Sequence, residues 1–247
     1  MPIPLVIGHA CAGGEAPHNT LAGVRACLAT GAHAMEIDVR LSADGVPVLM
    51  HDATVDRTTN LSGPVSSFTA AELAAADAGD GEKVPTLREV LERVDGRLTV
   101  MCELKSHEGP REEQNEYRTS LVRAVVKVCG DCGAEQWTAV HSFDRWIVLC
   151  AREVDVGMPA ALISPPVDRG EWADLFERTL ASNAQAVSMH FSSVDREFVL
   201  AAKKRQLTVY AWTPDEESEW ARLCDAGVDG IITNYPTRLT QFLASGS

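Results

Sequence analysis

The 247-residue sequence lacks several features that would each assign it to a particular class of protein. It has no run of 18 apolar residues, which a membrane-spanning helix requires. Its first residues contain no basic segment ahead of an apolar one, so we expect no signal peptide. The 22 basic residues are outnumbered by 35 acidic ones, and the net charge of −13 disfavours nucleic acid or an anionic membrane as a partner. We therefore expect a cytoplasmic protein without integral membrane association.

Disulfide bonds are also not expected. The seven cysteines are odd in number and scattered along the chain, which is typical of reduced thiols in the cytoplasm. Cys129 and Cys132 form a single CxxC pair without a second pair to complete a metal site. We interpret them as two thiols near the end of a helix.

Short apolar segments alternate with amphipathic segments along the chain, which is typical of β/α units around a parallel sheet. The predicted strands are residues 5–9, 34–39, 98–104, 137–141, 156–163, 186–189, 208–212 and 230–233. The predicted helices are residues 21–29, 88–94, 117–128, 146–153, 172–180, 197–204 and 216–226. Eight repeats in about 250 residues is the usual size of a TIM barrel. We predict an α/β fold, one (β/α)8-barrel domain spanning residues 1–247.

The alternation is interrupted at about residues 40–85. Asp44-Gly45 is a strong signal for a two-residue hairpin turn after the second strand. Counted back from such a turn, His51 would lie opposite Asp38, where the Cβ atoms of paired residues are about 4.5–5.5 Å apart. We predict a small inserted hairpin and loop subdomain over the mouth of the barrel.

Four charged residues follow the same spacing on two neighbouring strands. Glu36 and Asp38 are two residues apart on a strand, so their side chains point to one face. Carboxylates inside a barrel are costly unless a positive group lies between them. Glu103 and Lys105 repeat the spacing on the next barrel strand, adding a third acid and one lysine. A salt-bridge network would leave two acids uncompensated, so we favour a hard cation with oxygen ligands.

Histidines end several of the predicted strands. His9 ends the first strand and His51 ends the returning hairpin strand, so both can reach the acidic site. Imidazole titrates near neutral pH, and the pair is predicted to act as general acid and general base. His141 and His190 end later strands and could line the same pocket. Trp212 ends the seventh strand, where it could stack on a substrate group or pack in the core.

These residues belong to an ordered set of motifs that extends over nearly the whole chain. The set comprises Gly8-His9, Asn19-Thr20, residues 31–39, Asp44-Gly45, His51-Asp52, Arg57-Thr58-Thr59, residues 84–87, Glu103-Leu104-Lys105, Ser142-Phe143, Trp212-Thr213 and residues 227–236. It resembles the glycerophosphodiester phosphodiesterase family. The resemblance implies a TIM barrel with a small inserted subdomain.

The resemblance also implies a phosphodiester hydrolase that converts glycerophosphodiester-like small molecules into an alcohol and a phosphomonoester. The residues matching Glu36, Asp38 and Glu103 bind Mg or Ca in that family. Those matching His9 and His51 perform acid–base catalysis, with either one as the acid. A further list of substrate- or phosphate-binding candidates comprises Lys105, His18 and Trp212, of which the family resemblance assigns the phosphate contact to Lys105. The oligomeric state is left open.

Two motifs depart from the family's usual His-Arg-Gly and Glu-Asn-Thr. They read His9-Ala10-Cys11 and His18-Asn19-Thr20, so an arginine and a glutamate that could pair with each other are both absent. The bidentate contact of arginine to phosphate is lost, and His18 could replace part of that charge, bind metal or cap a helix.

The altered motifs leave two alternatives open. One is a different phosphoester reaction on the same barrel, such as lyase-type cyclisation or dephosphorylation of a biosynthetic intermediate. The other is a catalytically idle barrel that binds a phosphorylated ligand. Retention of three acids, two histidines and the lysine argues against the idle barrel, because buried charges without a function would only destabilise the fold.

Overall fold

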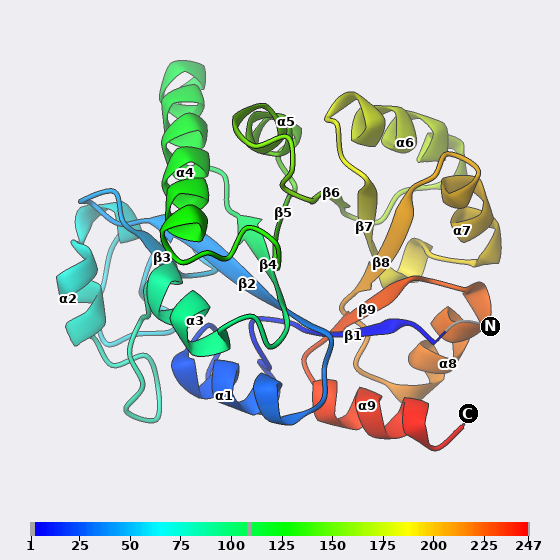
Figure 1. Ribbon diagram of the computed structural model, residues 1–247, viewed down its shortest axis with the longest axis horizontal. Coiled ribbons are helices and arrows are strands. Elements are labelled where there is room, and N and C mark those ends of the chain that lie inside the picture. Colours follow the sequence, from blue (N-terminus) through cyan, green and yellow to red (C-terminus); the bar gives the residue numbers. More distant parts are fainter. Residues whose placement is uncertain (1–2, 108–109, 247) are drawn as a thin grey trace.

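The computed structural model describes residues 3–107 and 110–246, in which eight parallel strands form a closed barrel (Figure 1). The barrel strands are β1 (Leu5–Gly8), β2 (Ala34–Leu41), β4 (Thr99–Leu104), β5 (Thr138–Ser142), β6 (Ala160–Ser164), β7 (Ala186–His190), β8 (Thr208–Trp212) and β9 (Gly230–Thr233). They pair in the order β1-β9-β8-β7-β6-β5-β4-β2, and β1 pairs with β2 to close the sheet. The predicted TIM barrel is confirmed.

A helix follows each barrel strand and packs outside the sheet (Figure 1). These helices are α1 (Leu21–Ala29), α3 (Leu87–Val94), α4 (Arg111–Asp131), α5 (Arg145–Val154), α6 (Trp172–Ala181), α7 (Arg196–Lys203), α8 (Glu217–Ala226) and α9 (Pro236–Ala244). Most helix bounds agree closely with those predicted. Helix α4 begins earlier than predicted, because its first turns are polar and have no apolar stripe by which the sequence could reveal them. Helix α9 was not predicted. Within the described ranges, no helix is both long and apolar enough to span a membrane.

An insertion between β2 and α3 contains strand β3 (Pro47–Leu49), the 3-10 turn η1 (Val65–Ser67) and helix α2 (Ala70–Ala75). It lies beside β2, at the left of Figure 1. Its own small apolar core consists of Val48, Met50, Val55, Val65, Leu73 and Val84. Because Met50 and Val55 belong to this core, the core fixes the segment that follows β3.

The predicted register of the hairpin was wrong by one residue. The antiparallel pairing of β2 with β3 places Asp38 level with Met50, whose backbone N–H donates to the Asp38 carbonyl at 3.0 Å. The loop contains three residues, 43–45, rather than two, and Gly45 at its end has a φ of 74°. This left-handed residue is typical of three-residue hairpin loops. His51 therefore follows the ladder instead of facing Asp38 across it.

The side-chain alternation of β2 places acids inside the barrel and apolar groups outside. Met35, Ile37 and Val39 pack in the core between the sheet and the helices. Glu36 and Asp38 point the other way and are almost inaccessible to solvent, each at 1% exposure. A layer formed by Ile7, Ala34, Met101 and Ile232 fills the barrel interior. The acids consequently lie in surroundings where an uncompensated charge is costly.

Phe198 on α7 offers a direct test of the packing between α7 and α6. Its ring is fully buried and lies 5.3 Å from Trp172 and 5.2 Å from Phe176, measured between ring centroids. We expect Phe198→Ala to lower the free energy of unfolding by about 3–5 kcal/mol, because a cavity would remain. Leu200→Ala on the exposed side of α7 should cost about 1 kcal/mol or less. Urea unfolding measures both, and equal losses would contradict the packing.

Candidate active site

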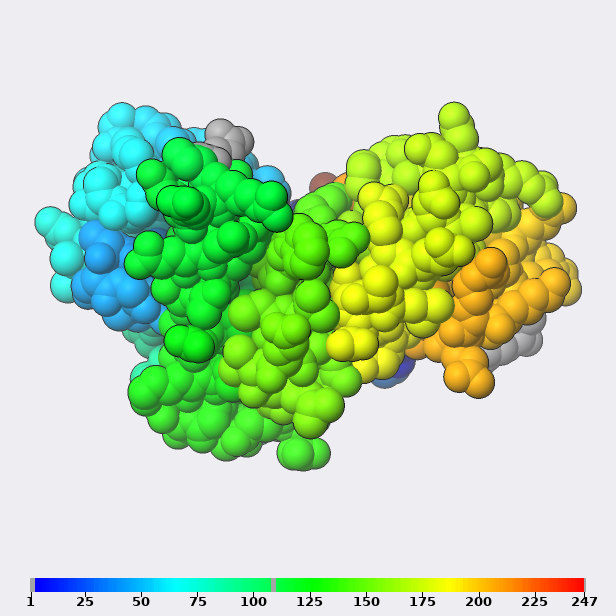
Figure 2. Space-filling model, turned by 90° about the horizontal axis from the view of Figure 1, so that it is seen from above, coloured from blue at the N-terminus to red at the C-terminus, as the bar shows by residue number. Residues whose placement is uncertain are grey.

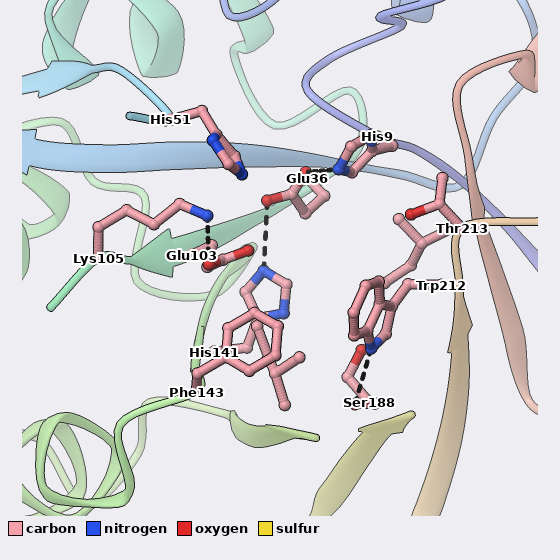
Figure 3. Close-up of a pocket in the computed structure, with 12 residues that line it drawn as sticks. His9, Glu36, His51, Glu103, Lys105, His141, Phe143, Ser188, Trp212 and Thr213 are labelled. Carbon is pink, nitrogen blue, oxygen red and sulfur yellow. Dashed lines mark hydrogen bonds and ion pairs between the residues drawn. The ribbon is translucent and has the colours of Figure 1, made fainter. Parts of the chain in front are cut away.

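A cavity of about 220 Å³ lies at the C-terminal ends of the barrel strands (Figure 3). From above, the surface is hollowed between the α4–α5 region, in green, and the α6 region, in yellow-green (Figure 2). The cavity is lined by His9, Glu36, His51, Glu103, Lys105, His141, Phe143, Ile163, Ser188, Trp212, Thr213 and Ile232. The active sites of TIM-barrel enzymes lie at this end of the barrel.

The loop after β1 is shaped around Glu36. Ala10 and Cys11 both adopt left-handed backbone angles, with φ of 46° and 73°, which residues with a Cβ atom rarely do. This conformation lets the N–H of Ala10 donate to Glu36 Oε2 at 2.9 Å and the N–H of Cys11 donate to the Glu36 carbonyl at 2.8 Å. The Ala10 side chain is buried. The loop therefore supports the carboxylate through its backbone.

Lys105 lies between two of the three acids. Its Nζ atom is 2.7 Å from Asp38 Oδ1 and also forms an ion pair with Glu103 (Figure 3). Asn19 donates from Nδ2 to the other oxygen of Asp38 at 2.6 Å. One lysine thus faces three buried carboxylates, those of Glu36, Asp38 and Glu103.

The pKa values reflect this imbalance. Burial alone would lower the pKa of Lys105, but the charges of Asp38 and Glu103 outweigh it and raise that pKa. Burial would raise the pKa of Asp38, yet the Lys105 charge holds it below its usual value. The pKa of Glu103 is raised, first by burial and then by its acidic neighbours, which Lys105 only partly offsets. The cluster has a deficit of positive charge.

The residues around Glu36 fit a metal ion. Glu36, Glu103 and His141 each offer a ligand atom, and these atoms lie within 4.8 Å of one another. Within residues 3–107 and 110–246, Glu36 Oε1 and both ring nitrogens of His141 are buried without a hydrogen-bond partner. A buried acceptor left unpaired is costly, so the donor set is suited to bind a cation.

The three predicted metal ligands have different surroundings. Glu36 and Glu103 belong to the metal-compatible group, whereas the Asp38 carboxylate contacts Lys105 and Asn19. The joint role of Glu36, Asp38 and Glu103 as ligands stays a prediction. His141 joins the group because β5 pairs with β4 so that His141 lies level with Glu103. The sequence indicated His141 only as a residue at the end of a predicted strand.

His9 is oriented by an amide that directly follows β9 and by a carboxylate in the loop after β8. His9 Nδ1 lies 2.8 Å from Asn234 Oδ1, and Asn234 Nδ2 donates to Asp215 Oδ2 at 2.7 Å. Because Asp215 takes the amide N–H, the amide oxygen faces His9, and His9 Nδ1 must carry the hydrogen. Burial lowers the pKa of His9, but Glu36 and the Asn234 hydrogen bond outweigh it and raise that pKa. Neither Asp215 nor Asn234 was predicted as a site residue.

His51 is held by a different kind of partner. Its Nδ1 atom lies 2.7 Å from Asp52 Oδ1, and Arg57 donates from Nε to Asp52 Oδ2 at 2.6 Å. The Arg57 hydrogen bond is the main reason that the pKa of Asp52 is held well below its usual range. Asp52 therefore stays ionised and accepts the Nδ1 hydrogen of His51. Both predicted catalytic histidines line the cavity, and His9 Nε2 lies 3.9 Å from Glu36 Oε2 (Figure 3).

The opposite wall of the cavity is largely apolar. The Trp212 indole donates to the Ser188 carbonyl at 3.1 Å, and Phe143 meets the indole edge-on at 5.5 Å between ring centroids (Figure 3). Ile163 and Ile232 complete this side. The cavity thus has a charged half and an apolar half, and Trp212 lies where an uncharged part of a substrate would pack.

His18 lies outside the main cavity. It lines an adjoining depression together with Arg57 and Thr58, and a narrower one that also includes His51. Burial, with a further contribution from the charges of His9 and Arg57, lowers the pKa of His18. The backbone N–H of Asn19 donates to the Ala10 carbonyl at 3.1 Å, so the two altered motifs are adjacent in space. A role for His18 in substrate binding stays a prediction.

Comparison with known proteins supplies independent information. A model of the glycerophosphoryl diester phosphodiesterase family matches residues 9–238. A glycerophosphodiester phosphodiesterase from Caldanaerobacter subterraneus subsp. tengcongensis is 31% identical over 262 aligned positions, covering 98% of this chain and 98% of that protein. Another from Bacillus subtilis (strain 168) is 26% identical, covering 94% and 84% respectively.

A solved structure shares the arrangement as well. The Oleispira antarctica phosphodiesterase, determined in complex with the product sn-glycerol-3-phosphate, superimposes with a TM-score of 0.86 at 27% identity. The similarity covers 98% of this chain and 97% of that one. It extends over the barrel and the insertion alike.

The orientation of His9 can be tested through Asp215. In Asp215→Asn, the Asn234 amide loses a partner that only accepts hydrogen bonds, so the amide can turn and the Nδ1–H tautomer of His9 should become less populated. Hydrogen bonds to charged groups contribute about 1.5–3 kcal/mol, enough to shift this equilibrium measurably. Nitrogen-15 NMR of the imidazole measures it, with His9→Gln identifying the signal. Asp229→Asn, at the N-terminal end of β9, is the matched control. An unchanged His9 tautomer in Asp215→Asn would contradict the assignment.

Proposed function

Because the chain belongs to the glycerophosphoryl diester phosphodiesterase family, we propose that it is a metal-dependent hydrolase of glycerophosphodiester-like small molecules. Its products would be an alcohol and a phosphomonoester. The observation that supports this function most is the charge arrangement of the site, where three buried acids and one lysine lie close to two histidines that outer partners orient. An anionic phosphodiester needs such a local source of positive charge in a protein with a net charge of −13.

We propose that Glu36, Asp38 and Glu103 hold a divalent cation, with His141 as an additional candidate ligand. A set dominated by carboxylate oxygens suits Mg or Ca. When bound, such an ion stabilises the negative charge that develops on the phosphoryl oxygens. Lys105 contributes a fixed positive charge beside Asp38 and Glu103, and its buried Nζ is suited to contact a non-bridging phosphate oxygen.

The two histidines would move the protons. Each has Nδ1 occupied, by Asn234 in His9 and by Asp52 in His51, so proton transfer takes place at Nε2. One imidazole accepts a proton from the attacking hydroxyl, which is water or a neighbouring alcohol of the substrate. The other donates a proton to the oxygen of the leaving alcohol. His51 and His9 come from different elements and lie on either side of Glu36 (Figure 3).

The apolar half of the cavity would hold the glycerol side of the substrate. Trp212 and Phe143 offer aromatic surface for carbon atoms, and the buried Ser188 hydroxyl, which has no hydrogen-bond partner among the described residues, could pair with a substrate hydroxyl. The Oleispira antarctica relative was solved with sn-glycerol-3-phosphate, a molecule that has both a phosphate and a polyol. A ligand with a charged end and an uncharged end matches a cavity whose charged half faces aromatic surface and the Ser188 hydroxyl.

A second candidate function is a different phosphoester reaction on the same site. The observation in its favour is the altered pair of motifs, in which the buried Ala10 and the exposed His18 stand where the family usually has arginine and glutamate. Without the guanidinium, phosphate binding depends more on Lys105 and the cation. Attack by a neighbouring substrate hydroxyl would then give a cyclic phosphate, a product that distinguishes this reaction from hydrolysis.

A phosphoester panel tests the proposed function. With Mg or Ca, we expect turnover of glycerophosphocholine to glycerol phosphate and choline, and EDTA should abolish it until the cation is restored. His9→Ala and His51→Ala should each lower kcat by about 10²–10⁴-fold, the usual contribution of general acid–base catalysis. His33→Gln at the other end of the barrel is the control and should retain kcat.

The outcomes of the panel separate the possibilities. Turnover that is insensitive to EDTA would contradict metal dependence. A cyclic phosphate as the final product would identify the cyclisation reaction. A folded protein that binds phosphoesters without converting any of them would contradict an enzymatic role.

A further inference from the structure

Arg40 continues the row of charged side chains on β2. The strand alternates so that Glu36, Asp38 and Arg40 share one face, and Arg40 is the member nearest the C-terminal end. Strand β2 extends two residues beyond Val39, the last residue that pairs with β4. Arg40 is partly buried there, between the insertion and the segment that follows β4.

The guanidinium of Arg40 joins two segments that carry site residues. Its Nε and Nη2 atoms both donate to the carbonyl of His51, at 3.1 and 3.0 Å. Its Nη1 atom donates to the carbonyl of Ser106 at 3.1 Å. Ser106 directly follows Lys105, so one side chain connects the backbone at the predicted catalytic histidine with the backbone next to the cavity lysine.

His51 needs such a support because regular structure ends before it. Strand β3 stops at Leu49, and the last ladder contact is the one from the Met50 N–H to Asp38. The His51 side chain is half exposed, and its partner Asp52 is also partly exposed. The planar guanidinium of Arg40 binds the His51 carbonyl with two donors and the Ser106 carbonyl with a third. This geometry restricts both the distance between the two backbone segments and their relative orientation.

We propose that Arg40 is a positioning residue that sets His51 at its place beside Lys105 and the acidic cluster. The proposal rests on the acid–base role of His51 proposed above. Arg40 acts through His51: the residues lining the cavity do not include it, and three of its N–H groups point at backbone carbonyls. Tyr117 of α4 packs beside the same strand, where its hydroxyl accepts from the Leu41 N–H at 3.4 Å.

The variants are Arg40→Met, which keeps the bulk and removes the donors, and Arg40→Lys, which keeps the charge but not the fork. Arg152→Met is the matched control, because Arg152 donates to the carbonyls of Asn183 and Met158 at the opposite end of the barrel. Arg40→Met should lower kcat by about 10–100-fold with little change in KM, since small misplacements of a catalytic group are costly. Arg40→Lys should recover only part of the loss. Arg152→Met should keep kcat even if both methionine variants lose similar stability in urea.

A double-variant cycle separates positioning from a general structural effect. If Arg40 acts through His51, Arg40→Met should lower kcat no further in a His51→Ala background. Independent, multiplicative losses would overturn the proposal, and so would a loss in Arg152→Met equal to that in Arg40→Met.

The mobility of His51 can be measured without any catalytic assay, so it tests the role of Arg40 independently of the proposed function. Nitrogen-15 relaxation of His51 should show greater mobility in Arg40→Met than in the wild type and Arg152→Met. Unchanged mobility would overturn the proposal. Absence of turnover in the wild-type protein would instead overturn the proposed function, while the mobility of His51 would still decide whether Arg40 holds it.

Discussion

Three carboxylates converge on one lysine inside the mouth of the barrel, and the local structure around them follows from that unequal charge. Glu36 and Asp38 are almost inaccessible to water, and Glu103 is nearly so. Carboxylates in such surroundings require hydrogen-bond donors and positive groups. In the loop after β1, the left-handed Ala10 donates its N–H to the Glu36 carboxylate, and Asn19 and Lys105 supply donors to Asp38. Among the described residues, Glu36 Oε1 has no hydrogen-bond partner and lies 3.6 Å from His141 Nε2, and Glu36 lines the cavity.

The histidines depend on a surrounding layer of polar residues that comes from distant parts of the chain. Asp215 and Asn234, from the loop after β8 and the end of β9, fix the ring of His9. Asp52 and Arg57, both in the insertion, do the same for His51. The insertion therefore contributes His51, together with the partners that hold it, to the lining of the cavity. Outer partners of this kind set which ring nitrogen carries the proton.

Much of this arrangement could be predicted from local sequence patterns. Alternation on a strand placed Glu36 and Asp38 inside and Met35 and Ile37 outside, and the apolar segments located all eight barrel strands. The hairpin register could not be obtained from the Asp44-Gly45 signal alone, because a two-residue and a three-residue loop share that dipeptide and differ by one position. His141 could be listed as a strand-end residue, but its place beside Glu36 depends on how β5 pairs with β4. No local pattern indicates the roles of Asp215, Asn234 and Arg40. Their contacts with His9 and with the His51 and Ser106 carbonyls join residues that are distant in sequence or depend on side-chain geometry.

Our proposal that the acidic cluster holds a divalent cation can be tested without any assay of turnover, through the stability of Glu36→Gln. Thermal unfolding of this variant and of the wild type would be compared in EDTA and in saturating Mg or Ca. A glutamine keeps an oxygen for the Ala10 N–H but removes one uncompensated charge, so in EDTA the variant should be at least as stable as the wild type. The cation should raise the unfolding temperature of the wild type markedly and that of the variant little, because an ion that binds only the folded state stabilises it. An equal response of the two proteins to the cation, or no response in the wild type, would contradict the claim.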